Sequence, residues 1–285
     1  VVTAELALDA DGIFTGLRVS TVANLGAYLT LLGPHSSTNN LGSLSNTYKT
    51  PAIYTHVTGV FTNTNSTGPY RGAGRPEAVY TVERVIDTAA REMGIDAAEI
   101  RRRNMIPEIS APFSTGFLFT YDSGEFEKNM DGALDMIEYG NFAARRTEAE
   151  GRGKLRGIGI ANCIEQSAGG PPEWAQIRFD PSGMVTLIMG THNHGQGHET
   201  IFRQMLADML GLEFEQVRLL QGDTDVVMAG TGTFGSRSSG VGGASIQAAS
   251  NKIVDKCKLV VSHYLEAAVE DIEFGDGTFT VAGTD

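Results

Sequence analysis

Three glycine-rich segments, each lying directly before a stretch with helical spacing, constrain this chain more than any other feature. They span residues 68–77, 191–200 and 230–240. The chain holds 35 glycines among 285 residues, without the strict period of collagen or the bias of a disordered tract. Glycine lacks a Cβ, so the backbone can turn tightly there and approach another group closely. We therefore expect a folded protein whose loops expose main-chain groups to a ligand.

Charge, hydropathy and cysteine content exclude several classes of partner. The formal net charge is −12, from 22 basic and 34 acidic residues, and such a surface repels the phosphate backbone of nucleic acid. No apolar run approaches the roughly 20 residues that cross a bilayer, so we expect no membrane insertion. The two cysteines, Cys163 and Cys257, are too few for a disulfide framework or a cysteine-ligated iron–sulfur cluster. A cytoplasmic location fits best.

The first half of the chain mixes hairpin patterns with helical ones. Alternating apolar residues on both sides of a turn at residues 9–12 predict a β-hairpin. Pro76 and Gly94 bound apolar residues at helical spacing and predict a helix. Further predictions are a strand at 53–61, helices at 97–103 and 132–148, and an irregular surface segment at 106–130. A polar run near residue 150 then predicts two domains, residues 1–150 and 151–285.

The second half repeats this mixture. A turn at residues 180–183 separates two alternating segments, with Pro and Gly where a type I turn takes them. The predicted strands cover residues 155–163, 173–179, 184–189 and 217–220; one helix ends at Gly211 and a long one covers 241–269. Antiparallel hairpins mixed with helices indicate an α+β fold, with mixed or antiparallel sheets and packed helices, and disfavour a Rossmann fold.

The first glycine-rich segment, residues 68–77, reads Gly-Pro-Tyr-Arg-Gly-Ala-Gly-Arg-Pro-Glu. Main-chain N–H groups at the start of the following helix, together with Arg71 or Arg75, would reach an anionic or oxo ligand. The glycine spacing matches no nucleotide-binding fingerprint. The alternative is a tight structural turn whose arginines are solvated.

The second segment carries three histidines between residues 192 and 198, around the tripeptide Gly195-Gln196-Gly197. Imidazole is a common metal ligand, but the glycines scatter the rings and no acidic residue stands at zincin spacing. We therefore name no metal-ligating residue. We favour exposed backbone at a helix N-terminus, where Gln196 offers an amide donor and an acceptor to a heterocycle.

The third segment places Ser236, Arg237 and Ser238 immediately before the long helix. Hydroxyls, main-chain N–H groups and an arginine gathered at a helix N-terminus predict a phosphate cradle, because the helix dipole and charge-assisted hydrogen bonds both favour an anion. The alternative is an ordinary helix cap, since serine is a common N-cap residue.

Together the three segments resemble the large, molybdopterin-binding subunit of the molybdenum hydroxylases, the family of xanthine dehydrogenase, aldehyde oxidase and aerobic carbon monoxide dehydrogenase. The matching residues are 70–78, 195–200, 222–225 and 232–238, and the nearest branch is the carbon monoxide dehydrogenase-like group. The resemblance implies an internal fragment, with part of a first molybdopterin-binding domain in residues 1–150 and part of a second in residues 151–285.

The resemblance also implies roles for individual residues. Arg71 and Gly72 would belong to the loop near molybdenum. The other implied cofactor-binding residues are Ala73, Gly74, Gly195, Gln196, Gly197, His198, Thr233, Gly235, Ser236, Arg237 and Ser238. The implied cofactor is molybdopterin, in its cytosine dinucleotide form, with molybdenum held by the pterin dithiolene and not by a protein thiolate. We expect none bound to this fragment alone.

The implied activity is hydroxylation of an aldehyde or aromatic heterocycle, with water as the oxygen source. FAD and [2Fe-2S] clusters on partner subunits or domains would take the electrons, and the full enzyme is expected to be an oligomer. The family's catalytic glutamate lies beyond the last matching segment, so the fragment alone should be inactive. Carbon monoxide oxidisers carry a copper-holding cysteine where this chain has Gly72. The alternatives are a non-catalytic molybdopterin carrier or degenerate remnant, and a true carbon monoxide dehydrogenase.

Overall fold

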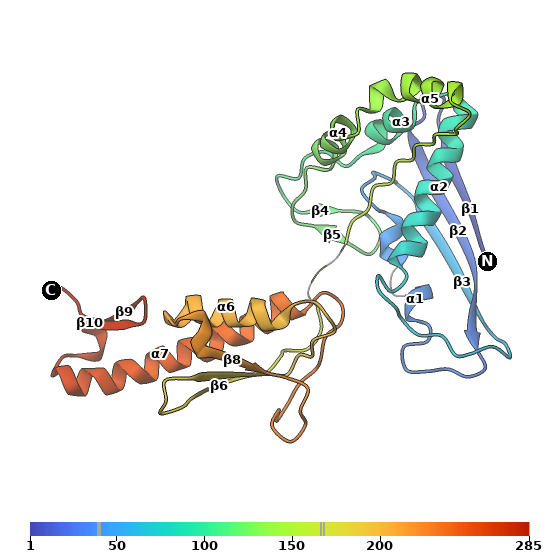
Figure 1. The fold of residues 1–285 in the computed structure, drawn as a ribbon. Coiled ribbons are helices and arrows are strands. Elements are labelled where there is room, and N and C mark those ends of the chain that lie inside the picture. The colour runs from blue at the N-terminus through green and yellow to red at the C-terminus, as the bar shows by residue number, and fades with distance from the viewer. Residues whose placement is uncertain (39–40, 166, 168, 285) are drawn as a thin grey trace. The chain divides into compact units, whose positions relative to one another are not determined.

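The structure is a computed structural model that describes residues 1–38, 41–165, 167 and 169–284 (Figure 1). Its contacts divide the chain into two units, Val1–Glu165 and Gln166–Asp285. This division falls beyond the polar run near residue 150. Each unit combines a three-stranded sheet with helices, and the predicted α+β class is confirmed.

The sheet of the first unit has the strand order β1-β2-β3. The predicted hairpin is present, because β1 (Val2–Leu8) runs antiparallel to β2 (Phe14–Gly26). The Asp9 carboxylate closes the turn between them by accepting two backbone N–H groups. Strand β3 (Ile53–Phe61) occupies the residues predicted for it and pairs with β2 in parallel.

Helix α2 (Arg75–Met93) packs against β1 and builds the core of the first unit. Val82 and Ile86 of the helix meet Phe14 and Leu17 of β2 in one buried cluster. The helix ends at Gly94 as predicted, with a left-handed φ of 68° that lets the glycine N–H reach the last carbonyls. The other elements of this unit are α1 (His35–Thr38), α3 (Ala97–Asn104), β4 (Phe113–Ser114), β5 (Thr120–Tyr121), α4 (Phe126–Met136) and α5 (Phe142–Gly151), with 3₁₀ turns at Leu41–Leu44 and Tyr139–Asn141.

Two predicted elements are wrong. Residues 155–163 form no strand. Two of their carbonyls accept side-chain donors in place of a neighbouring strand, Ile160 from Arg101 and Asn162 from Asn46, and most of the segment is exposed. The single helix predicted at 132–148 is in fact α4 and α5, since Glu138 takes a left-handed φ of 49° that an α-helix does not allow.

A buried ion pair joins α2 to α3. The Arg101 side chain is fully buried and pairs with Glu83 and Asp87 of α2. The Tyr48 hydroxyl donates to the same Glu83 carboxylate at 2.7 Å. Burial raises the pKa of Glu83, and the neighbouring Arg101 charge opposes that rise. The guanidinium also donates to the Ile160 carbonyl, so this pair ties the segment after α5 to the helices.

Replacing Arg101 with Met should destabilise the first unit by about 3–5 kcal/mol, because it leaves the Glu83 carboxylate buried without its counter-ion. The matched control is Arg146→Met, which removes the exposed Arg146–Glu150 pair of α5 and should cost about 0–1 kcal/mol. Hydrogen exchange of α2 amides in the natural full-length polypeptide measures both changes. Equal protection in the two variants would contradict the prediction.

The second unit contains the other predicted hairpin. Strand β6 (Ala175–Phe179) pairs antiparallel with β7 (Val185–Met189), and β8 (Val217–Leu220) pairs with β7 in parallel. Helix α6 (His198–Leu210) connects β7 to β8 and ends at Gly211 as predicted.

A long helix, α7 (Gly243–Leu265), packs against α6. A π-helical turn, Ser238–Gly242, leads into it, so the helical region begins slightly before the predicted 241 and ends before the predicted 269. Phe202, Leu206 and Ile246 are buried with the sheet side chains in one core. The chain continues with β9 (Ile272–Gly275) and β10 (Thr278–Val281), and 3₁₀ turns lie at Phe214–Gln216 and Val269–Asp271. Among the helices described, none combines the length and apolar character needed to cross a membrane.

Candidate functional site

The first glycine-rich loop lies in the first unit and leads directly into α2. Gly72, Ala73 and Gly74 all take positive φ angles, of 86°, 47° and 96°. A Cβ added to Gly74 would lie 2.0 Å from the Ser36 carbonyl oxygen, so only glycine fits against the neighbouring backbone. Ala73 adopts a conformation that is costly for a residue with a side chain, and such strain is concentrated at functional sites.

The two arginines of this loop have different surroundings. Arg71 is exposed. Arg75, at the first position of α2, pairs with Glu165 at 3.3 Å and is only 14% exposed. Of the two, Arg71 has the more open surroundings.

The second glycine-rich loop lies in the second unit, between β7 and α6. The Asn193 carboxamide oxygen accepts the N–H groups of Gly195 and Gln196. The Gln196 side-chain oxygen accepts the His194 N–H, so its amide nitrogen stays turned outward as a donor. Gly197 precedes the helix with a φ of 78° and provides no side-chain cap. The Thr200 N–H bonds the Gly197 carbonyl, so within the described part of the chain the N–H groups of His198 and Glu199 are left for another acceptor.

His198 is the buried member of this loop. Its side chain is 2% exposed, and Nε2 has no hydrogen-bond partner. The Gln221 amide nitrogen lies 3.3 Å from Nδ1. Because an amide NH2 group only donates, this contact fits a neutral ring whose proton is at Nε2. Burial lowers the pKa of His198, and the nearby His194 and His192 lower it further. The result is a buried neutral donor without an acceptor.

The three histidines do not form a metal site. His192 stacks against Gly222 and lies near the exposed His194, with ring centroids 4.8 Å apart, while His198 is buried below against Phe202. Across the described ranges, no group of three His, Cys, Asp or Glu side chains is arranged to hold a metal ion.

The third glycine-rich loop places its three named residues in different surroundings. Ser236 is exposed and has a positive φ of 55°, and Ser238 is half-buried. Neither serine caps the helix that follows. Arg237 is buried, and its guanidinium donates to Glu173, to the Gly232 carbonyl and to the Pro171 carbonyl. In this structure Ser236 is exposed, the Ser238 hydroxyl lies 3.3 Å from that of Thr233, and the arginine faces the protein interior.

The second and third loops meet in the second unit. The His192 N–H donates to the Thr233 hydroxyl at 3.0 Å, and this hydroxyl lies 3.3 Å from that of Ser238. A Cβ on Gly190 would lie 2.6 Å from the Gly230 Cα, so the two backbones touch where the loops begin. The loops that carry the predicted residues 195–198 and 233–238 are thus in direct contact, with His198 and Arg237 buried and their exposed residues at 195–197 and 234–236. The first loop, residues 71–74, belongs to the other unit.

Glu173 was missed by the sequence reasoning. Its carboxylate is fully buried and accepts hydrogen bonds from Arg237 and from the backbone N–H groups of Trp174, Thr231 and Gly232. Burial by itself raises the pKa of Glu173, but these hydrogen bonds outweigh it and lower the pKa below its ordinary value. A carboxylate before a strand carries no local signal that it pairs with an arginine far along the chain.

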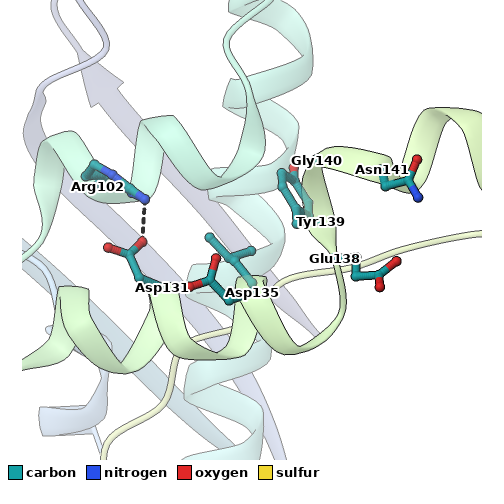
Figure 2. A pocket seen from close by; sticks show the side chains of 8 residues that line it. Arg102, Asp131, Asp135, Glu138, Tyr139, Gly140 and Asn141 are labelled. Atoms are coloured by element: carbon teal, nitrogen blue, oxygen red, sulfur yellow. Dashed lines mark hydrogen bonds and ion pairs between the residues drawn. The ribbon is translucent and has the colours of Figure 1, made fainter.

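A cavity of about 510 Å³ lies elsewhere, in the first unit (Figure 2). Figure 2 shows Arg102 of α3 paired with Asp131 of α4, near Asp135 and Tyr139. The Tyr139 hydroxyl donates to Asp96. Burial of the phenol and this hydrogen bond together raise the pKa of Tyr139 to about 12. None of the predicted site residues lines this cavity.

Two family models match the chain, both described as molybdopterin cofactor-binding domain, over residues 1–105 and 132–285. The second alone covers more than half of the sequence. This chain belongs to the molybdopterin cofactor-binding family. The resemblance inferred from the three loops is thereby confirmed.

Relatives of this family show how much of a subunit the chain represents. The carbon monoxide dehydrogenase large chain of Hydrogenophaga pseudoflava is 36% identical over 99% of this chain and 37% of its own length. The 6-hydroxypseudooxynicotine dehydrogenase complex subunit gamma of Paenarthrobacter nicotinovorans is 31% identical, over 99% and 36%. The crystal structure of quinoline 2-oxidoreductase from Pseudomonas putida 86 is 33% identical with a TM-score of 0.89, over 98% and 37%. The chain therefore spans little more than a third of these relatives.

Replacing Gly195 with Ala should lower cofactor content without unfolding the protein. Gly195 has a φ of 101°, and no atom lies within 4 Å of an added Cβ. The substitution should therefore destabilise the cofactor-free protein by only about 1–2 kcal/mol, through backbone strain. A ligand seated on the loop would also meet the methyl group. Gly183→Ala is the matched control, since this turn glycine has a φ of 88° and equally open surroundings. The pterin and molybdenum content of both full-length variants tests this; equal content would remove the loop from the ligand surface.

Acidification should destabilise the second unit through His198. Because its folded pKa lies below the ordinary 6.5, the unfolded state binds more protons once the pH falls below about 6.5, and stability is lost there. Denaturant unfolding of the full-length protein at about pH 7.5 and about pH 5.5 should show a smaller loss for His198→Gln than for the unmodified protein. His56→Gln, at an exposed position on β3, serves as the control and should leave the loss unchanged.

Proposed function

We propose that this chain is the molybdopterin-binding segment of an oxidoreductase that hydroxylates an aldehyde or an aromatic heterocycle. The observation that carries the proposal is the direct contact between the second and third loops in a chain of the molybdopterin cofactor-binding family. On these two loops the glycines at 195, 197, 232 and 235 have open space where a side chain would stand. These loops thus leave room for a ligand against their backbone.

The donors of these two loops fit a pterin with an anionic tail. The buried Nε2–H of His198 has no partner in the protein, and an unsatisfied buried donor is costly. The Gln196 amide and the first N–H groups of α6 add donors for the polar edge of a heterocycle. The hydroxyls of Ser236 and Ser238 suit the phosphate end. We propose the cytosine dinucleotide form, on the resemblance to the carbon monoxide dehydrogenase-like branch.

When bound, the molybdenum cofactor supplies a two-electron oxidation in which water provides the oxygen. A carbon–hydrogen bond is replaced by a carbon–oxygen bond, and two electrons and two protons leave. The residues of this chain bind and orient the cofactor. The base that the resemblance implies, a glutamate, lies outside these residues, and the chain alone is proposed to be inactive.

The proposed substrate class rests on the first loop. Gly72 stands where carbon monoxide oxidisers carry a cysteine, and the cysteines of this chain, Cys163 and Cys257, lie outside that loop. The loop therefore offers no thiolate to copper. Relatives named for nicotine-type and quinoline substrates favour an aromatic heterocycle or an aldehyde over carbon monoxide.

We further propose that the electrons pass to [2Fe-2S] clusters and FAD on partner subunits or domains. The support is indirect: relatives carry names such as large chain and subunit gamma, which denote one subunit of a complex. With two cysteines, this chain cannot ligate such a cluster by itself. An oligomeric enzyme in the cytoplasm is the proposed setting.

The proposal is tested by the cofactor content of the natural full-length protein and of its Ser236→Ala and Ser238→Ala variants. Each lost hydrogen bond to a phosphate should cost about 1.5–3 kcal/mol, a factor of about 10 to 150 in affinity. Ser262→Ala on α7, whose hydroxyl bonds its own helix, should retain full content. Absence of molybdopterin from the unmodified protein would refute the proposal, and cofactor without turnover on any aldehyde or heterocycle would indicate a carrier.

A further inference from the structure

We infer that Glu173, through its buried ion pair with Arg237, is a positioning residue that holds the cofactor-facing loops in place, and that Arg237 does not itself contact the phosphate. This inference rests on the proposed function for the identity of the ligand. The contacts of Glu173 and Arg237 do not depend on that identity, and all of them lie in the second unit.

Glu173 connects three segments that are far apart in the sequence. One oxygen accepts the N–H groups of Trp174 and Thr231, at 3.0 and 3.1 Å, and the other accepts the N–H of Gly232 at 3.2 Å and the Arg237 guanidinium. A Cβ on Gly190 would lie 2.3 Å from the first oxygen. The carboxylate thus stands where the backbones at 190, 230 and 173 meet.

Arg237 completes the same arrangement from the other side. It donates to the carbonyls of Gly232 and Pro171, both at 2.6 Å, and the side chains of Arg237 and Glu173 are both 0% exposed. The Thr231 hydroxyl adds a bond to the Pro172 carbonyl at 3.1 Å. The loop at 231–238 is therefore joined to the segment at 171–174 by five hydrogen bonds. Both terminal nitrogens of the guanidinium are engaged, and although Nε has no partner among the described residues, the whole side chain is closed to solvent.

The loop at 231–238 carries the groups proposed to face the cofactor. Thr233 directly follows Gly232, whose N–H is bonded to Glu173. The Thr233 hydroxyl accepts the His192 N–H and lies beside the Ser238 hydroxyl. Ser236 and Ser238 flank the buried Arg237 in the sequence. Because the arginine is held inward, the backbone on either side of it is fixed, with Ser236 exposed and the Ser238 hydroxyl beside that of Thr233. The pair thereby sets the positions of both hydroxyls.

Arg237 could bind the phosphate directly or could position the loop. These two roles predict opposite effects on cofactor binding when the charge of Glu173 is removed. If Arg237 bound the phosphate directly, Glu173 would compete with that phosphate for the guanidinium, and removing its charge would strengthen binding. If the pair positions the loop, removing the same charge leaves a buried arginine unpaired and several backbone N–H groups weakly held, and binding falls. The sign of the effect of Glu173→Gln therefore separates the two roles.

The experiment compares Glu173→Gln, Arg237→Met and the double variant in the natural full-length protein. Molybdenum and pterin content should fall at least about tenfold in both single variants, and the double variant should lose little more, because one interaction is removed in all three. Glu148→Gln, which breaks the exposed Glu148–Arg152 pair of α5, should retain full content. Content that rises in Glu173→Gln, or losses that add in the double variant, would overturn the inference.

Hydrogen exchange supplies a readout that does not need the cofactor. In cofactor-free protein, Glu173→Gln should speed exchange at the Thr231 and Gly232 amides while the amides of β7 and α6 keep their protection. Unchanged exchange at 231 and 232 would overturn the inference even if the cofactor content fell. If the unmodified protein holds no molybdopterin but these amides respond, the proposed function fails and the positioning role stands.

Discussion

A buried arginine paired with a buried carboxylate is the interaction on which each unit of this chain depends. Arg101 with Glu83 holds α2, α3 and the segment after α5 in the first unit, and Arg237 with Glu173 holds the loops of the second. Removing two charges from water is expensive, and the cost is offset when other donors and acceptors hydrogen-bond to the buried pair. The surrounding backbone must therefore converge on the pair, and this convergence gives the loops their shape.

The many glycines serve two distinct needs. Gly74, Gly190 and Gly230 are crowded, since an added Cβ would meet backbone atoms of another segment at 2.0 to 2.7 Å. Gly195, Gly197 and Gly235 have left-handed backbone but open surroundings. The first group permits close packing of the chain against itself. The second group leaves bare backbone facing outward, which is what a closely bound flat ligand requires.

Regular elements followed from the sequence wherever their own residues decide them. The strand at 53–61 and the helix bounded by Pro76 and Gly94 were predicted closely, because alternation, helical spacing and glycine caps are local signals. The segment at 155–163 alternates in the same way but forms no strand. Its carbonyls at Ile160 and Asn162 accept the side chains of Arg101 and Asn46, and nothing in the segment itself reveals those distant donors.

The sequence by itself determined the α+β class, most element boundaries, the three glycine-rich loops and, through them, the family. These depend on residue type and short-range spacing. Only the tertiary structure decided that the second and third loops are in direct contact, that Arg237 faces inward to Glu173, and that His198 is a buried donor without a partner. The direction of a charged side chain depends on which partner lies within a few ångströms, and that partner can stand anywhere along the chain.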